Sequence, residues 1–178
     1  MSIQEETELI RAAKADPACF APLYERYFNA IYRFLLRRCQ HRELAADLTQ
    51  QTFLKAMVAL GSFTDHGVPF RAWLYRIALN EIRMYWRKRK EVVIDIDRSE
   101  ALLIATDLAI AEPDEQLHRL AQALSRLDAR KAQLIELRYM DGASFAEIGA
   151  IMEIGEDAAK MRLHRVLQFL RNYLAKKP

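Results

Sequence analysis

The chain has 178 residues, 52% of them hydrophobic and 29% charged, with a net charge of +3, which excludes a polypeptide that is disordered throughout. This length allows one medium-sized domain or two small ones, and the presence of only five Gly and five Pro favours helices over a β-sandwich or barrel. No apolar run approaches the ~20 residues of a membrane-spanning helix, and the N-terminal sequence does not resemble a signal peptide. We therefore expect a cytoplasmic protein with no direct membrane insertion.

The first 60 residues contain three predicted helices. Residues 5–15 form a short helix that ends at Asp16-Pro17, because Asp caps a following helix and Pro fits its first turn. A second helix has an apolar stripe, and a third spans about residues 43–60 before the loop at 61–69. The stripe of the second helix consists of Phe20, Leu23, Tyr24, Tyr27, Ile31, Phe34 and Leu35.

The most informative segment, FRAWLYRIALNEIRMYWRKRK, spans residues 70–90 and predicts one amphipathic helix. Its cations oppose the single acid Glu81, so one face can pack a core while the other meets a nucleic-acid backbone. Tyr85 and Trp86, just before the basic run, offer unpaired bases a stacking surface. The predicted inward residues are Phe70, Trp73, Leu74, Ile77, Ala78 and Ile82, and the predicted nucleic-acid contacts are Arg71, Arg76, Asn80, Arg83, Trp86 and Arg87.

Residues 93–113 interrupt the helical pattern. They are acidic, end at Pro113 and show no sustained amphipathic period, so we interpret them as a linker with one short helix. The chain is therefore predicted to be all-α, with a first domain at 1–92 and a second at 114–178. The order of charge along it is basic, acidic and basic.

The second domain contains a predicted helix-turn-helix. Ser144 and Glu147 have the spacing of a capping box that begins a short helix. A break follows, in which Gly155 is expected to adopt a left-handed conformation, and the last helix spans about residues 156–174. In such a motif the second helix enters the major groove, where Arg and Lys reach guanine O6 and N7 or hold phosphates. The predicted DNA contacts on the last helix are Lys160, Arg162, His164 and Arg165.

The sequence shows no pattern typical of an enzyme or a metalloprotein. Cys19 and Cys39 do not form a CxxC pair, and Cys39 with His41 supplies too few ligands for zinc. The four histidines are scattered, and no Ser/His/Asp set or phosphate-binding glycine loop occurs. We expect no catalytic residue, no metal and no cofactor.

Taken together, these motifs resemble the sigma-70 family of RNA polymerase sigma factors, specifically the small extracytoplasmic-function (ECF) type. The resemblance covers nearly the whole chain. DLTQQTF, residues 47–53, is similar to the segment that grips the clamp helices of RNA polymerase, and FRAWLYRIALN, residues 70–80, to the segment that opens the −10 promoter element. The sequence from ALSRLDARKAQ to KMRLHRVLQFLR resembles the domain that reads the −35 element.

The resemblance implies a role for particular residues and partners. It places polymerase binding at Asp47, Gln50, Gln51 and Phe53, base capture in the loop at 61–69, and passage through polymerase in the acidic linker. The expected partners are core RNA polymerase, promoter DNA and an anti-sigma factor, with a monomer when the protein is free. The chain departs from the family at Gln51, where Glu is usual, at Ala158 and Ala159, where Thr and Val are common, and at Leu167, where a basic residue is frequent.

Two other interpretations remain open from the residues alone. A stand-alone helix-turn-helix regulator explains the second domain, and it predicts a dimer on a palindromic operator. It leaves DLTQQTF and the order of charge unexplained. A helical adaptor without a DNA role explains neither basic segment.

Overall fold

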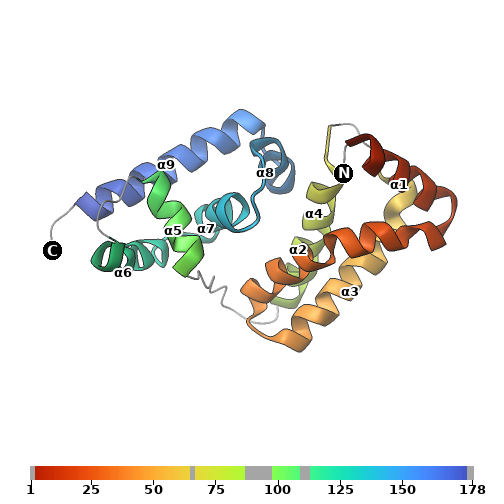
Figure 1. Cartoon of the computed structure of the whole chain (residues 1–178), viewed down its shortest axis with the longest axis horizontal. Coiled ribbons are helices and arrows are strands. Elements are labelled where there is room, and N and C mark those ends of the chain that lie inside the picture. Colours follow the sequence, from red (N-terminus) through yellow and green to blue (C-terminus); the bar gives the residue numbers. More distant parts are fainter. Residues whose placement is uncertain (1–2, 65–66, 87–97, 109–112, 176–178) are drawn as a thin grey trace. The chain divides into compact units, whose positions relative to one another are not determined.

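The computed structural model describes residues 3–64, 67–86, 98–108 and 113–175, and within these ranges every regular element is a helix (Figure 1). The all-α fold class predicted from the sequence is confirmed. The chain divides into two compact units, Met1–Glu91 and Val92–Pro178.

The first unit packs its helices around an aromatic and aliphatic core. Leu23, Ile31 and Phe34 of the second helix are fully buried. In the fourth helix Leu74 is also fully buried, and the side chain of Tyr75 is only 1% exposed. The predicted Asp16 cap is present, since its carboxylate accepts a hydrogen bond from the amide of Ala18 at 2.9 Å. The elements are α1 (Ile3–Ala15), η1 (Pro17–Phe20), α2 (Ala21–Cys39), α3 (Arg42–Ala59), η2 (Leu60–Ser62) and α4 (Phe70–Trp86).

Helix α4 is buried on a wider face than its sequence predicts. Trp73 and Ile77, which we expected to point inward, are only half-buried, whereas Ala72, Tyr75 and Leu79 are buried. The reason is that α4 packs against both α2 and α3, so that two sides of the helix are covered. The sequence pattern identified the helix but placed the centre of its buried face incorrectly.

An aromatic cluster fixes the start of the loop that precedes α4. The ring of Phe63 lies 5.4 Å from that of Phe70 and 4.9 Å from that of Trp73. From the other side, the ammonium of Lys14 in α1 donates a hydrogen bond to the carbonyl oxygen of Phe63 at 2.5 Å. The loop therefore leaves the core from a defined position beside the N-terminal end of α4.

A partly buried ion pair joins α3 to α4. The Lys55 ammonium lies 2.6 Å and 2.8 Å from the two carboxylate oxygens of Glu81. Glu81 is only 6% exposed, whereas the side chain of Lys55 is 51% exposed. The single acid of the basic helix is thus held in the interior of the first unit by Lys55.

The second unit contains five α-helices within the described ranges and one π-helical turn. Its core includes Leu120, Ile135, Leu137, Ile148 and Leu170, all 1% exposed or less. The elements are α5 (Arg98–Asp107), α6 (Pro113–Leu124), α7 (Ala129–Ile135), the π-helical turn η3 (Glu136–Met140), α8 (Phe145–Met152) and α9 (Glu156–Ala175).

Helix α5 lies inside the segment that the sequence analysis interprets as a linker, and it packs as part of the second unit. It buries Ile104 against α6 and η3. Asp107 fixes its end, because its carboxylate accepts a hydrogen bond from the Tyr139 hydroxyl at 2.7 Å and its carbonyl accepts one from Arg171 at 2.9 Å. The one short helix expected in the linker is therefore a structural part of the second unit.

The helix-turn-helix has the predicted capping box but a different turn. Ser144 and Glu147 cap each other's backbone amides at 3.1 Å and 2.8 Å. The left-handed residue is Glu153, with φ 58°, so the expectation for Gly155 is wrong. The glycine required by close packing is Gly149, where a Cβ would lie 2.9 Å from the carbonyl oxygen of Ile154.

We predict that Gly149→Ala destabilises the second unit by about 1–3 kcal/mol, because its methyl group would collide with backbone that cannot move aside. Gly155→Ala is the matched control, since nothing lies within 4 Å of a Cβ there and its φ is not positive. Gly155 lies at the N-cap of α9, where Ala is less favourable than Gly, so this variant should cost about 0.5 kcal/mol, less than Gly149→Ala. Amide hydrogen exchange of α8 and α9 measures both, and equal protection in the two variants would contradict this packing.

We further predict that Lys55→Met lowers the free energy of unfolding of the first unit by about 1–3 kcal/mol, because it leaves the Glu81 carboxylate buried without its cation. The double variant Lys55→Met, Glu81→Met should recover most of that loss. Both tryptophans lie in the first unit, so their fluorescence in urea reports it selectively.

The control for the ion pair is Arg11→Met. Arg11 lies 3.9 Å from Glu8 in an exposed pair, with side chains 77% and 70% exposed, and its loss should change stability by less than about 0.5 kcal/mol. If the double variant Lys55→Met, Glu81→Met is no more stable than Lys55→Met alone, the loss of stability does not come from the unpaired Glu81 carboxylate.

Candidate nucleic-acid interface

Helix α9 presents its predicted DNA-binding residues on its exposed surface. Its buried positions recur at three- and four-residue spacing at Ala159, Leu163, Val166 and Leu170 and hold the helix against the second unit. The opposite face carries cations, preceded by the exposed acids Glu156 and Asp157 in the first turn. All four predicted contacts are exposed, namely Lys160, Arg162, His164 and Arg165.

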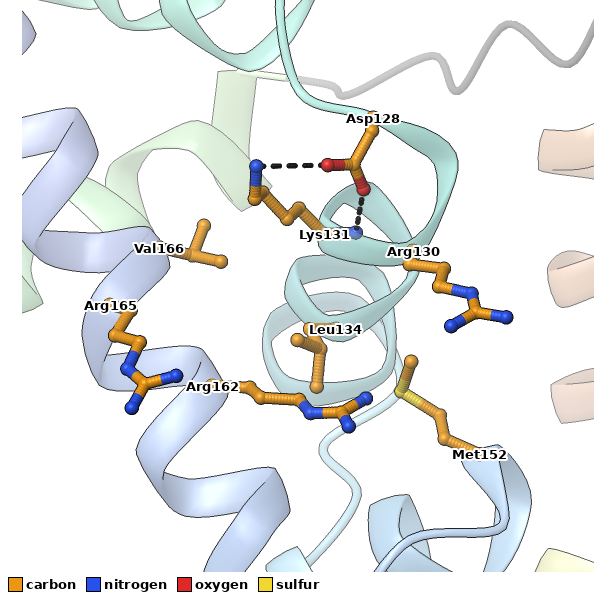
Figure 2. A pocket seen from close by; sticks show the side chains of 8 residues that line it. All are labelled: Asp128, Arg130, Lys131, Leu134, Met152, Arg162, Arg165 and Val166. Carbon is orange, nitrogen blue, oxygen red and sulfur yellow. Dashed lines mark hydrogen bonds and ion pairs between the residues drawn. The ribbon is translucent and has the colours of Figure 1, made fainter.

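The cationic surface continues from α9 onto α7. A pocket of about 280 Å³ lies between the two helices and is open to solvent (Figure 2). Arg130 and Lys131 at the start of α7 line it and were not predicted as contacts. The sequence could have indicated both residues, because Asp128-Ala-Arg-Lys places two cations shortly after a residue type that caps helices. The residues that line the pocket are Asp128, Arg130, Lys131, Leu134, Met152, Arg162, Arg165 and Val166.

Asp128 neutralises only one of these cations. Its carboxylate caps α7 by accepting a hydrogen bond from the amide of Lys131 at 2.9 Å, and it pairs with the Lys131 ammonium at 2.9 Å (Figure 2). These side-chain and backbone contacts with Lys131 hold the pKa of Asp128 below its usual value. Within the described part of the chain, no acid pairs with Arg130, Arg162 or Arg165.

The second basic region, on α4, is divided between surface and core. Asn80 and Arg83 are exposed, while Arg71 and Arg76 are half-buried. The Arg71 guanidinium lies over the ring of Tyr75, 5.4 Å from its centroid, so part of this side chain is used in packing. Of the remaining predicted contacts, the side chain of Trp86 and all of Arg87 lie outside the described residues.

Helix α3 exposes polar and apolar side chains together. Asp47, Gln50 and Gln51 are exposed, which a binding face requires. Beyond them lie two large apolar side chains that sequence reasoning missed, Leu54 at 58% and Val58 at 78% exposure. These residues recur every three or four positions, so they share one side of the helix.

Phe53 requires a correction. We predicted it as a partner contact, but it is 3% exposed, and its ring lies 4.8 Å from Tyr24 and 6.4 Å from Phe20. It belongs to the core because α3 packs against α2 on that side. Its role is to position the exposed face of α3.

The described residues contain no group of three or more His, Cys, Asp or Glu side chains that could hold a metal ion. Cys39 is buried, its thiol donates a hydrogen bond to the carbonyl oxygen of His41 at 3.3 Å, and burial raises its pKa. The imidazole of His41 instead caps α3 by accepting a hydrogen bond from the amide of Leu44 at 3.2 Å. In the ranges that the structure covers, no helix is long and apolar enough to cross a membrane.

Comparison with known protein families matches both units. The family model Sigma-70 region 2 matches residues 23–92, and Sigma-70, region 4 matches residues 123–172. The first match contains nearly all of α2 together with α3 and α4, and the second contains α7, α8 and most of α9. The exposed faces described above therefore lie within the two matched regions.

Individual relatives agree with these matches. The ECF RNA polymerase sigma factor BldN of Streptomyces coelicolor is 31% identical over 173 residues, which cover 94% of this chain and 65% of BldN. The RNA polymerase sigma factor YlaC of Bacillus subtilis is 33% identical over 161 residues, covering 86% of this chain and 91% of YlaC. The solved structure of CnrH in complex with the cytosolic domain of CnrY is similar with a TM-score of 0.61 and 28% identity, covering 93% and 94% of the two chains.

Proposed function

The chain belongs to the sigma-70 family and is an RNA polymerase sigma factor of the ECF type, a non-catalytic transcription initiation factor, and from this premise we propose how its surfaces divide the work. The second unit reads the −35 element as duplex, the first unit captures the −10 element as melted strand, and α3 binds core RNA polymerase. The observation that carries the proposal is the exposed cationic face of α9, the second helix of the helix-turn-helix. A stand-alone regulator does not explain the match of the first unit to region 2.

Reading of the −35 element rests on α9 and its neighbours. The buried Leu163 and Val166 fix the rotation of the helix, so that Arg162 and Arg165 face outward. Guanidinium groups suit guanine edges and phosphates because they donate two parallel hydrogen bonds. Lys160 and His164 extend the same face, and Arg130 adds a cation from α7.

Capture of the −10 strand rests on α4 and the preceding loop. Exposed Asn80 can bond a base edge, and Arg83, with the half-buried Arg71 and Arg76, can follow the phosphates. Trp73 is half-buried beside Phe63, so the loop that begins at Phe63 leaves the core next to an accessible aromatic ring. Stacking of unpaired bases offsets part of the cost of opening the duplex, which is a few kcal/mol per base.

Polymerase binding rests on the exposed face of α3. Asp47, Gln50 and Gln51 supply polar contacts, and Leu54 and Val58 supply apolar area that costs free energy while it faces water. A contiguous apolar and polar stripe of this kind is typical of a protein–protein interface. Phe53 supports this face from the core.

We also propose that a protein partner regulates the chain in the cytoplasm, where it is a monomer when free. The related CnrH was solved in complex with the cytosolic domain of CnrY, which supports a partner for this chain as well. By the resemblance to its family, that partner would be an anti-sigma factor. It would compete with polymerase for the exposed stripe of α3.

We predict that Arg162→Gln weakens binding to a −35 duplex at least tenfold and lowers the slope of log K against log salt by about 1, because one phosphate or base contact is lost. Fluorescence anisotropy with matched and scrambled sites measures the affinity. Loss of a base contact would reduce the preference for the matched site, whereas loss of a phosphate contact would weaken binding to both sites equally. Arg11→Gln carries the same change of charge and should have no effect. An unchanged affinity for Arg162→Gln would exclude this face.

We predict that Val58→Asp abolishes co-elution with core RNA polymerase on a sizing column without DNA, because an ionised carboxylate would be desolvated in the interface. The side chain is 78% exposed, so the fold should be unchanged. Met84→Asp, at a 59% exposed site on α4, is the control and should still co-elute. A folded Val58→Asp that binds like wild type would refute the assignment of α3.

A further inference from the structure

Helix α9 carries an apolar side chain at the centre of its exposed surface. Met161, in the second turn of the helix, is 55% exposed. A helix turns by about 100° per residue, so Met161 lies on the opposite side of α9 from the buried Ala159 and Leu163, two positions before and after it. The outermost position of this part of the helix is therefore occupied by a thioether and not by a cation.

Two cations lie to either side of Met161. Lys160 and Arg162 are its chain neighbours, so each projects about 100° away from it around the helix. Figure 2 shows the Arg162 side chain extending from α9 past Leu134 toward Met152, along the pocket between α7 and α9. In a major groove these two cations would face the phosphates on the walls, whereas Met161 would face the base edges on the floor.

The side of α9 that carries Met161 is otherwise polar in the neighbouring turns. Asp157 and Arg165 lie four residues before and after Met161, so they share its side of the helix, and both are exposed. Phe169, the other large apolar side chain exposed on α9, lies more than two turns further on. A carboxylate, a thioether and a guanidinium therefore follow one another along one line of the helix.

The chemistry of the major groove decides which base suits this thioether. Every base pair presents hydrogen-bond donors or acceptors there, and thymine alone adds an apolar group, its C5 methyl. A thioether has no hydrogen-bond donor and is only a weak acceptor, so against a polar base edge it would displace water without replacing the bonds of that water. Its unbranched, polarisable chain can instead adjust to a methyl group and exclude water from it.

We propose that Met161 is a specificity-determining residue of this chain, and that it selects thymine in the −35 duplex by packing its thioether against the C5 methyl group. The inference deepens the proposed reading of the −35 element and rests on it. Because the contact carries no charge, it contributes to the sequence preference of binding and not to its dependence on salt.

Removal of the methyl group from the DNA tests the contact directly. The full chain first selects its preferred duplexes from a library of random sequences. Each thymine of a selected duplex is then replaced in turn by deoxyuridine, which lacks only the methyl group. Fluorescence anisotropy should show about a fourfold loss of affinity at the thymine that Met161 contacts, the effect of one methyl group left in water. In Met161→Ala, the same replacement should have no effect.

Two variants separate base reading from general binding to DNA. Met161→Ala should weaken binding to the selected duplex by about fourfold or more and leave the slope of log K against log salt unchanged, since no charge is removed. Met161→Gln has nearly the same length and can donate and accept paired hydrogen bonds at adenine, so selection with this variant should return adenine where the wild type returns thymine. Met84→Ala, at a 59% exposed site on α4, is the control and should behave like wild type.

The outcomes distinguish this inference from the function on which it rests. If deoxyuridine weakens binding of the wild type and of Met161→Ala equally, the methyl group meets another residue, and the inference is wrong while −35 reading stands. It is also wrong if Met161→Ala binds the selected duplex normally but no longer co-elutes with core RNA polymerase, because the side chain would then serve a protein contact. A wild-type chain that selects no sequence, and whose Arg162→Gln variant binds DNA equally well, would overturn −35 reading itself and this inference with it.

Discussion

Small helical units impose one constraint on this protein: each functional helix must bury one side in a core of limited size and keep the other available to a partner. In α9 the two sides are separated cleanly, because Leu163 and Val166 are buried between exposed cations. In α4 the separation is incomplete. It packs against two neighbours, so Arg71 and Arg76 share their side chains between packing and surface. The rotation of each helix in its core decides which of its cations a nucleic acid can reach.

The placement of acids is the second part of this arrangement. Glu81 is the only acid in a strongly basic helix, and it is taken into the interior by Lys55 of α3. Asp128 is held by Lys131 at the start of α7. In both cases a lysine binds the carboxylate that lies beside a cationic surface. Arginine also retains its charge at any physiological pH, whereas the proton of a lysine is more easily lost on burial.

Much of the fold followed from the sequence because its information is local. The capping box at Ser144 and the cap at Asp16 depend on residues within four positions, and both are present as predicted. Features that depend on distant residues were missed or misplaced. Phe53 looked like part of a polar motif and is buried, because α2 supplies the aromatic rings around it. Likewise, the composition of residues 93–113 indicated a linker with one short helix, while α5 packs as part of the second unit, against α6 and against η3, from which Tyr139 bonds Asp107. Arg130 joins the cationic surface only through the packing of α7 against α9.

The acidic first turn of α9 has a consequence for how a duplex can approach. Helix N-termini ordinarily attract phosphates through their free amides and the helix dipole. Here Glu156 and Asp157 occupy that turn, with Glu153 just before it, and all three are exposed. A phosphate group at this end would be repelled, and favourable charge begins only at Lys160. The tip of the helix is therefore suited to the floor of the groove, where carboxylates accept hydrogen bonds from the amino group of cytosine. In the proposed complex with the −35 duplex, the turn between α8 and α9 would thus set which end of the helix lies nearest the bases.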